Sequence, residues 1–380
     1  MCLADFVSRR GGIALIQLYL AIVVGGESVN ASGRPLFEYA KSMLGHIAAM
    51  QCPDAIKTVA LLSVALRQAD EVMSAWHTMG MAVRAALSHS VDSTSWKSLR
   101  TLQELMAFEL GKSSHLTEQN HDDLGSSQSK APSDLIASLA SHLSVIGRQC
   151  VAVSQPEEQD IDVEKIVDAI YKKVRTVGEA CLTLFRWTDS VPLELRPTDD
   201  FVCDAAQGWA CRFISTQYHS AILMLTRNSL LINAEAIELA IEQVAQDAPW
   251  SGIIRNGPNI AANAARRLLR LELDTKGPYL NALLVLSVFV VTQPTSRLTA
   301  SDTKLIESVS HALLAAHPSD TQLQDLLSTV ASLVGPSPPT SQPTATNSQE
   351  DGLFAANWNE LVWDWDMGTL EPTLQGDSSV

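Results

Sequence analysis

The sequence predicts an all-α protein of about 12 helices, followed by an acidic C-terminal tail. Apolar residues recur at three- and four-residue spacing along most of the first 334 residues, which is the pattern of amphipathic helices. Alternating apolar and polar runs bounded by turn residues, which indicate strands, are hard to find. A Pro/Ser/Thr-rich stretch and an acidic stretch follow residue 334. We therefore expect one large, bundle-like helical domain over residues 1–334.

A helix is predicted wherever the apolar spacing persists. Asp54, Ser95 and Ser301 are expected N-caps, and Pro278 suits a first helical turn. The expected helices cover 12–24, 36–50, 54–67, 71–89, 95–110, 133–148, 163–188, 200–228, 234–246, 259–273, 278–291, 301–316 and 320–334. The polar segment 112–132 is expected to be a surface loop because it is rich in Ser, Gly and Asp.

The N-terminal run "MCLADFVSRRGGIALIQLYLAIVVGG" imitates a signal peptide because two arginines precede an apolar stretch. Arg9 and Arg10 come late, Gln17 and Tyr19 interrupt the stretch, and no small-x-small cleavage site closes it. The run is therefore predicted to be a core helix. The apolar stretch 279–291 is too short to cross a bilayer. We expect a soluble protein, neither secreted nor spanning a membrane.

Composition limits the classes of partner. The net charge is −15, so this chain is not expected to hold a phosphate backbone without a separate basic module. The six cysteines are scattered, with neither a C-x-x-C pair nor the Cys/His spacing of a zinc site. Buried free thiols in a reducing compartment are the expected state of Cys2, Cys52, Cys150, Cys181, Cys203 and Cys211.

The signatures of common enzymes are missing from the sequence. It has no P-loop, no G-x-G-x-x-G after a strand, no G-x-S-x-G and no H-E-x-x-H, so no catalytic, metal or cofactor residue is predicted. One alternative is a magnesium-dependent helical-bundle enzyme of the isoprenoid-synthase kind, which would use Asp199, Asp200 and Asp204. A second magnesium motif is missing, so acids favoured by a helix N-terminus are the preferred interpretation.

Histidines give no further site. The "NHDD" stretch at 120–123 is similar to the His-Asp pair of metal phosphohydrolases, but it falls in the predicted loop. His77, His89, His142 and His219 lie on separate predicted helices, where a single histidine is more often a satisfied packing residue than a ligand.

The C-terminal region divides into a linker and a tail. The segment "GPSPPTSQPTATNSQEDG" at 335–352 cannot bury enough apolar area to offset its chain entropy, so it is predicted to be a linker. Residues 353–380 form an acidic tail, since neither Lys nor Arg follows Lys304. Within it, "WNELVWDWDMGTLEP" at 358–372 interleaves three tryptophans with carboxylates.

The stretch "VALLSVALRQADEVMSAWHTMGMAVRAAL" at 59–87 reads as two amphipathic helices broken near Ala69–Asp70, with one apolar stripe on the second. It resembles the middle homology region of fungal-specific transcription factors, the regulators that carry a zinc binuclear cluster. The family's "A-W-x-x-x-G-x-A-x-R-x-A" element is met by Ala75, Trp76, Gly80, Ala82, Arg84 and Ala86. Trp76, Gly80 and Arg84 serve as markers of this helical core.

Further segments follow the family's order between about residues 13 and 292. These are "LFEYAKSML" at 36–44, "FELGKSSHLTEQNHDD" at 108–123, "VPLELRP" at 191–197, "STQYHSAILMLTRNSLL" at 215–231 and "NAARRLLRLE" at 263–272. The basic helix "R-R-x-x-W-W" of the family is replaced by "SWKSLRTLQELMAFEL", which offers only Trp96, Lys97 and Arg100. The six-cysteine zinc cluster that binds DNA in this family would lie upstream of Met1.

The resemblance implies a nuclear transcription regulator that acts through protein contacts rather than catalysis. Zinc would be implied only if an upstream cysteine cluster belonged to the protein, and DNA contact only through such a module or a partner's module. Homo- or heterodimers are possible partners, and similar tails occur in regulators of fungal secondary-metabolite genes. A co-regulator or dominant-negative partner that does not bind DNA is the alternative within the same family.

The tail is expected to bind a coactivator or another protein of the transcription machinery. Repulsion between Glu360, Asp364, Asp366 and Glu371 keeps the neighbouring apolar side chains exposed, and aromatic side chains supply most of the affinity in such contacts. A tail that packs back on its own domain through Trp363 and Trp365 is the alternative. The expected docking residues are Leu361, Trp363, Trp365 and Met367.

Overall fold

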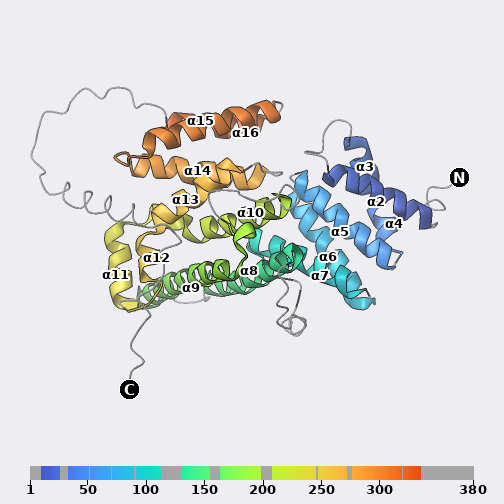
Figure 1. The fold of residues 1–380 in the computed structure, drawn as a ribbon, viewed down its shortest axis with the longest axis horizontal. Helices are drawn as coiled ribbons and strands as arrows, with labels where there is room; N and C mark the ends of the chain where they lie inside the picture. Colours follow the sequence, from blue (N-terminus) through green and yellow to red (C-terminus); the bar gives the residue numbers. More distant parts are fainter. Residues whose placement is uncertain are drawn as a thin grey trace, which may run out of the picture. The chain divides into compact units, whose positions relative to one another are not determined.

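The computed structural model describes residues 10–25, 33–50, 52–69, 71–89, 91–112, 114, 116, 131–154, 163–197, 208–244, 247–271, 276–318 and 320–334. Over these residues the protein is all-α, as predicted, and contains no strand (Figure 1). The chain forms two compact units, Met1–Val285 and Leu286–Val380, with the boundary inside helix α14.

The helices are defined as follows. The first unit contains α2 (Arg10–Gly25), α3 (Arg34–Ser42), α4 (Leu44–Ala48), α5 (Pro53–Gln68), α6 (Val72–Ser88), α7 (Ser93–Glu109), α8 (Pro132–Ser154), α9 (Val163–Ser190), α10 (Gly208–Thr226), α11 (Ala234–Val244), α12 (Ser251–Arg255) and α13 (Gly257–Arg270). Two 3₁₀ helices, η2 (Leu193–Leu195) and η3 (Arg227–Leu231), flank α10. α14 (Lys276–Thr292) precedes α15 (Thr299–Ala316) and α16 (Thr321–Val334).

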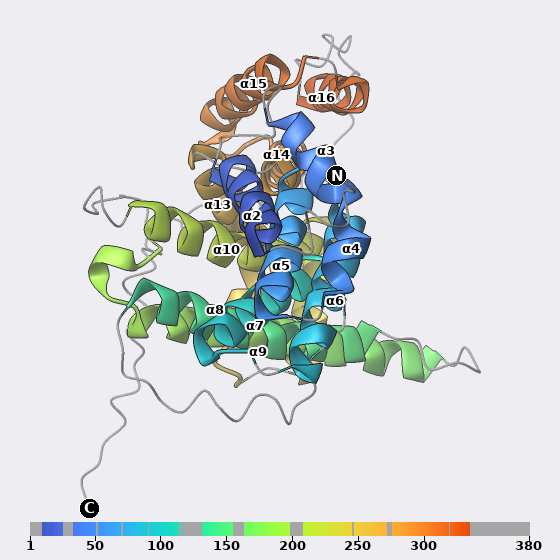
Figure 2. The ribbon, with the colours of Figure 1, turned by 90° about the vertical axis from the view of Figure 1, so that its right-hand side faces the viewer.

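The N-terminal helices share one apolar core. Helix α5 packs against both α6 and α2, and α4 also contacts α5 (Figures 1 and 2). Ile13, Ile16, Leu20 and Val23 of α2 recur at three- and four-residue spacing and are all buried in this core. Burial of one face of α2 confirms that the N-terminal apolar run is a core helix.

Helices α8 to α13 form most of the rest of the first unit. Helix α8 contacts α7, α9 and α10, while α10 packs mainly on α13. The segment 132–153 of α8 is long and apolar enough to span a bilayer, judged by length and composition alone. In the structure, Leu135, Leu139, Leu143 and Ile146 make one side of α8 part of the core.

The second unit contains a helical hairpin, α15–α16, after the last residues of α14. Helix α15 buries Ile306, Val309 and Leu313 at spacings of three and four residues, and α16 buries Leu323, Leu327 and Val330 in the same way. Asp320 accepts a hydrogen bond from the backbone N–H of Leu323 at 3.0 Å, as an N-cap does. The tail residues 353–380 and the linker 335–352 lie outside the described residues.

Several predicted boundaries were wrong. The helix expected over 36–50 is divided at Met43, whose N–H donates to the carbonyl oxygens of both Tyr39 and Ala40, a 3₁₀-like tightening of the turn. The short helix α12 was not predicted, because its five residues are too few to show a periodic pattern. Residues 200–207, expected to be helical, lie outside the described part of the chain.

The three predicted N-caps were also wrong. Helix α7 is capped by Asp92, whose carboxylate accepts bonds from the backbone N and Oγ of Ser95 at 2.9 and 2.7 Å. Helix α5 begins one residue before Asp54, so this residue lies in the first turn and caps nothing. Ser301 likewise lies inside α15, and its hydroxyl donates to the carbonyl oxygen of Leu298.

Candidate functional site

The docking residues predicted in the tail, Leu361, Trp363, Trp365 and Met367, lie outside the described residues. So do Asp199, Asp200 and Asp204 of the alternative enzyme site and the histidine and two aspartates of the "NHDD" stretch. Among the residues that the structure describes, no group of three or more His, Cys, Asp or Glu side chains could hold a metal ion.

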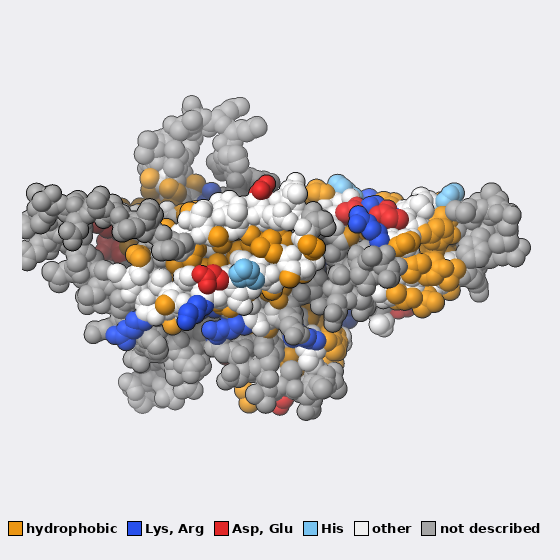
Figure 3. All heavy atoms as spheres, turned by 90° about the horizontal axis from the view of Figure 1, so that it is seen from above, with side chains coloured by type: hydrophobic (Ala, Val, Ile, Leu, Met, Phe, Trp, Pro, Cys, Tyr) orange, Lys and Arg blue, Asp and Glu red, His pale blue; other side chains and the backbone are white. Residues whose placement is uncertain are grey.

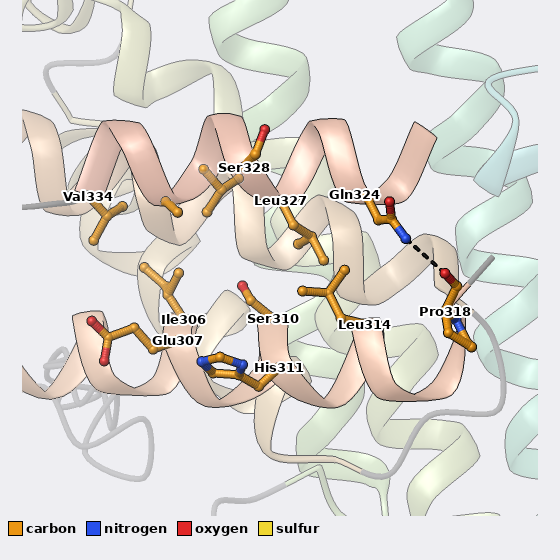
Figure 4. Close-up of a pocket in the computed structure, with 12 residues that line it drawn as sticks. Ile306, Glu307, Ser310, His311, Leu314, Pro318, Gln324, Leu327, Ser328 and Val334 are labelled. Atoms are coloured by element: carbon orange, nitrogen blue, oxygen red, sulfur yellow. Dashed lines mark hydrogen bonds between the residues drawn. The ribbon is translucent and has the colours of Figure 1, made fainter. Parts of the chain in front are cut away.

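An apolar groove lies between α15 and α16, and we call it the hairpin groove. Its volume is about 580 Å³, and its residues from the two helices point toward each other across the gap (Figure 4). The lining residues are Ile306, Glu307, Ser310, His311, Leu314, Pro318, Gln324, Leu327, Ser328, Val330, Ala331 and Val334. A volume of this size falls in the range of clefts that bind small ligands or a few large side chains.

The amino acids at the groove explain why it exists. Its floor consists of Ile306, Leu327 and Val330, which are at most 3% exposed. Small side chains at Ser310, Ser328 and Ala331 line it beside that floor and fill little of the space between the helices. A hairpin with larger residues at these positions would close over its own floor.

One end of the hairpin groove is fixed by the turn between the helices. Gln324 donates from Nε2 to the carbonyl oxygen of Pro318 at 2.8 Å, and both residues line the groove (Figure 4). Val334, the last described residue, lines the groove as well. Among the described lining residues, only Glu307 and His311 are ionisable. The groove therefore suits apolar side chains with charges kept at its edge.

Hydrophobic side chains are visible on the face of the molecule that carries α15 and α16, with an acidic side chain and a histidine close to them (Figure 3). Leu333 of α16 is 51% exposed. On α2, in the first unit, Leu18 and Ile22 are also more than half exposed. Single exposed apolar residues on a helix are common and need no explanation. A groove with a buried apolar floor is a binding site more often than such single residues are.

The A-W element lies on α6 and is mostly buried. Trp76, Met79, Gly80 and Val83 form the buried stripe that the sequence predicted, whereas Arg84 is exposed. Arg84 lines a pocket of about 180 Å³ together with Ile47, Ile56 and Met81, among others. Trp76 and Gly80 thus belong to the core, and of the three marker residues only Arg84 is accessible to a partner.

Helix α7 carries a buried ion pair that the sequence did not reveal. Arg100 Nε donates to Glu104 Oε1 at 3.0 Å, and these side chains are only 6% and 1% exposed. Burial raises the pKa of the Glu104 carboxyl, although Arg100 and Arg148 oppose that rise. The neighbouring Gln103 is fully buried, and its amide has no hydrogen-bond partner within the described chain. Spacing alone could have suggested the pair, since Arg100 and Glu104 are four residues apart.

A second buried polar group lies on α10. The Tyr218 ring stacks on Trp187 with centroids 6.2 Å apart and meets the His219 ring edge-on at 5.1 Å. Burial lowers the pKa of His219 well below 6.5, and the charge of Arg267 lowers it further. His219 was predicted to be a satisfied packing residue; it is buried, but its Nε2 has no hydrogen-bond partner among the described residues.

The other predicted histidines and the described cysteines are scattered. His77 is exposed, and His142 Nδ1 lies 2.8 Å from the carbonyl oxygen of Ser138 on its own helix. Four cysteines are described, and all are free; Cys181 and Cys211 are buried, while Cys52 and Cys150 are partly buried. Burial raises the pKa of the Cys181 thiol to about 12, so this side chain is protonated at neutral pH.

Neither the fold nor these sites can be assigned by comparison. No protein-family model, no curated protein and no solved structure matches this chain.

Proposed function

We propose that this protein is a transcription regulator of the fungal-specific type, in which a helical body carries a tail that binds a coactivator in the nucleus. Two features of the sequence support the proposal. The first is the order of the family-like segments between residues 13 and 292, including the A-W element on α6. The second is the composition of the tail, which combines aromatic side chains with carboxylates.

The observation that carries the proposal is the interleaving within residues 358–372. Trp363, Trp365 and Met367 alternate with Asp364 and Asp366, Leu361 follows Glu360, and the surrounding residues lack any Lys or Arg. An amphipathic segment of this kind gains affinity when its aromatic side chains enter an apolar groove of a partner. The surrounding negative charge accelerates encounter with a basic partner surface. The partner is thus a protein with an apolar groove bordered by Lys or Arg.

DNA contact is assigned to another module in this proposal. The net charge of −15 disfavours a hold on the phosphate backbone, and the cysteines of the sequence lack the spacing of a zinc cluster. The regulator would reach DNA through a partner or through an upstream zinc cluster. Sequencing transcripts upstream of Met1 separates a co-regulator from a DNA-binding regulator, since six closely spaced in-frame cysteines would indicate the latter.

The test is a reporter assay with residues 335–380 fused to a heterologous DNA-binding module. We expect activation that falls at least about tenfold when Trp363 and Trp365 are both changed to Ala, because two aromatic anchors carry most of the affinity. The matched control changes Asn357 and Asn359 to Ala and should leave activation unchanged. Absence of activation, or full activation by the Trp363→Ala/Trp365→Ala fusion, would refute the proposal.

A further inference from the structure

We infer that the hairpin groove is the binding site for this chain's own tail, in which Trp358, Leu361 and Trp365 insert as one face of a short helix. The groove is formed by the last two described helices, and the tail follows them in the sequence. The groove offers an apolar floor with charges only at Glu307 and His311 among its described lining residues. The tail offers the large apolar side chains that such a floor accepts.

The spacing of the tail residues selects which side chains enter. In a helix, positions i, i+3 and i+7 fall on one face, and these are the positions of Trp358, Leu361 and Trp365. We call these three residues the tail stripe. In the same helix Glu360 falls away from the stripe and Asp364 falls on its flank, so both carboxylates can stay in water at the edge of the groove. Two indoles and a leucine can therefore be buried without desolvating an acid.

The length of the chain allows this contact. Val334 lines the groove, and 23 residues separate it from Trp358. Fully extended, they span up to about 80 Å, whereas the 14 residues of α16 measure only about 21 Å. The tail stripe can therefore reach any point along the groove and can lie in either direction.

The covalent connection favours the tail over a second copy of the chain. A tether of this length gives an effective concentration on the order of millimolar. A second copy at micromolar concentration competes at a disadvantage of about a thousandfold. Even a segment of modest affinity therefore occupies the groove of its own chain.

The inference deepens the proposed function, because Leu361 and Trp365 belong both to the tail stripe and to the expected coactivator contact. A partner must then displace the tail from the groove before it can bind these two residues. Docking itself does not depend on the proposed function. Only the competition with a coactivator does.

Hydrogen exchange of the full chain, followed by mass spectrometry, tests the inference. Amides of residues 358–367 should exchange about tenfold more slowly in the wild-type chain than in Ala331→Arg, because a docked population of about nine-tenths slows exchange by about that factor. The matched control is Ala312→Arg, an exposed alanine of α15 outside the groove lining, which should keep the wild-type protection. Ser328→Lys provides a second block of the groove if Ala331→Arg disturbs the hairpin.

Variants of the tail test which face of the tail helix enters the groove. Changing Trp358 and Trp365 together to Ala should remove the protection, whereas changing Trp363 and Met367 to Ala should preserve it. Protection that is lacking in the wild type, or that survives Ala331→Arg and Ser328→Lys, overturns the inference. The inference is also overturned if the average molecular mass in solution rises with protein concentration while the amides of the tail exchange freely. A second copy of the chain would then fill the groove.

The reporter assay separates this inference from the proposed function. An active tail fusion without protection of 358–367 in the full chain refutes docking and leaves the function standing. An inactive fusion with protection that is lost in Ala331→Arg refutes the function and supports docking. If both hold, a full-length fusion that carries Ala331→Arg should activate the reporter several-fold more than wild type.

Discussion

Replacement of Gly178 by Ala is expected to destabilise the first unit because Trp250 occupies the space that a side chain would need. A Cβ added at Gly178 would lie 2.4 Å from Cε3 and 2.5 Å from Cδ2 of the buried Trp250 indole. Carbon atoms normally approach to about 3.5–4.0 Å, so the indole or α9 must move by about 1 Å. Trp250 is the residue at the start of α12, and α12 packs on α9. Such overpacking costs about 1–3 kcal/mol.

The higher helix propensity of Ala opposes this loss of stability. Ala is favoured over Gly in a helix interior by about 1 kcal/mol, which reduces the net loss for Gly178→Ala to about 0–2 kcal/mol. Gly147→Ala in α8 is the matched control, since its Cβ would meet Phe108 Cδ2 at an ordinary 3.4 Å. The same substitution should there stabilise the protein by about 0.5–1 kcal/mol.

Urea unfolding followed by circular dichroism measures both effects. Gly178→Ala should lower the midpoint and Gly147→Ala should raise it, with unchanged slopes. In a double-mutant cycle, Trp250→Leu should reduce the cost of Gly178→Ala, because the smaller side chain leaves room for the new methyl group. A Gly178→Ala variant that is stabilised as much as Gly147→Ala, or a cost that persists in full in the Trp250→Leu background, would show that the indole does not pack on α9 as described.

Two further predictions concern buried ionisable groups. Burial lowers the pKa of His219, so the unfolded chain binds a proton below about pH 6.5 that the folded chain does not bind. Lowering the pH from about 7.5 to 5.5 should therefore reduce the free energy of unfolding by about 1 kcal/mol through this residue. His219→Gln should lack this part of the pH dependence when urea midpoints are compared at the two pH values. Glu104→Ala should lose about 3 kcal/mol or more in the same assay at neutral pH, because it removes the buried partner of Arg100, whereas Glu104→Gln, which keeps an acceptor, should lose less. Equal losses for the two variants at Glu104 would contradict the role of the hydrogen bond.

The helical class and most helices could be predicted from the sequence because burial of one face leaves a periodic trace. The stripe at Trp76, Met79, Gly80 and Val83 was predicted and is buried on α6. Helix ends were less predictable, since a cap depends on which nearby side chain the backbone geometry selects. Asp92 caps α7 where Ser95 had been expected, and both residues are good capping types.

The buried polar groups were visible in the sequence only as residue types. Arg100 and Glu104 could have been exposed on α7, and nothing in the spacing required that both be covered by neighbouring helices. His219 could likewise have faced solvent, since one histidine on a helix has no periodic signature. The pKa shifts of Glu104 and His219 follow from this burial, so they could not be predicted before the structure was known.

The sequence alone determined the helical class, most of the helical segments and the apolar stripe of α6, and it determined the charge and aromatic content of the tail. Only the tertiary structure decided which faces remain partly uncovered. The hairpin groove depends on Ser310 of one helix and Ala331 of another coming together over a shared apolar floor. The two positions lie in different helices, so periodicity along one helix cannot reveal the space between them. A groove is a property of packed pairs of helices, and local sequence specifies each helix only singly.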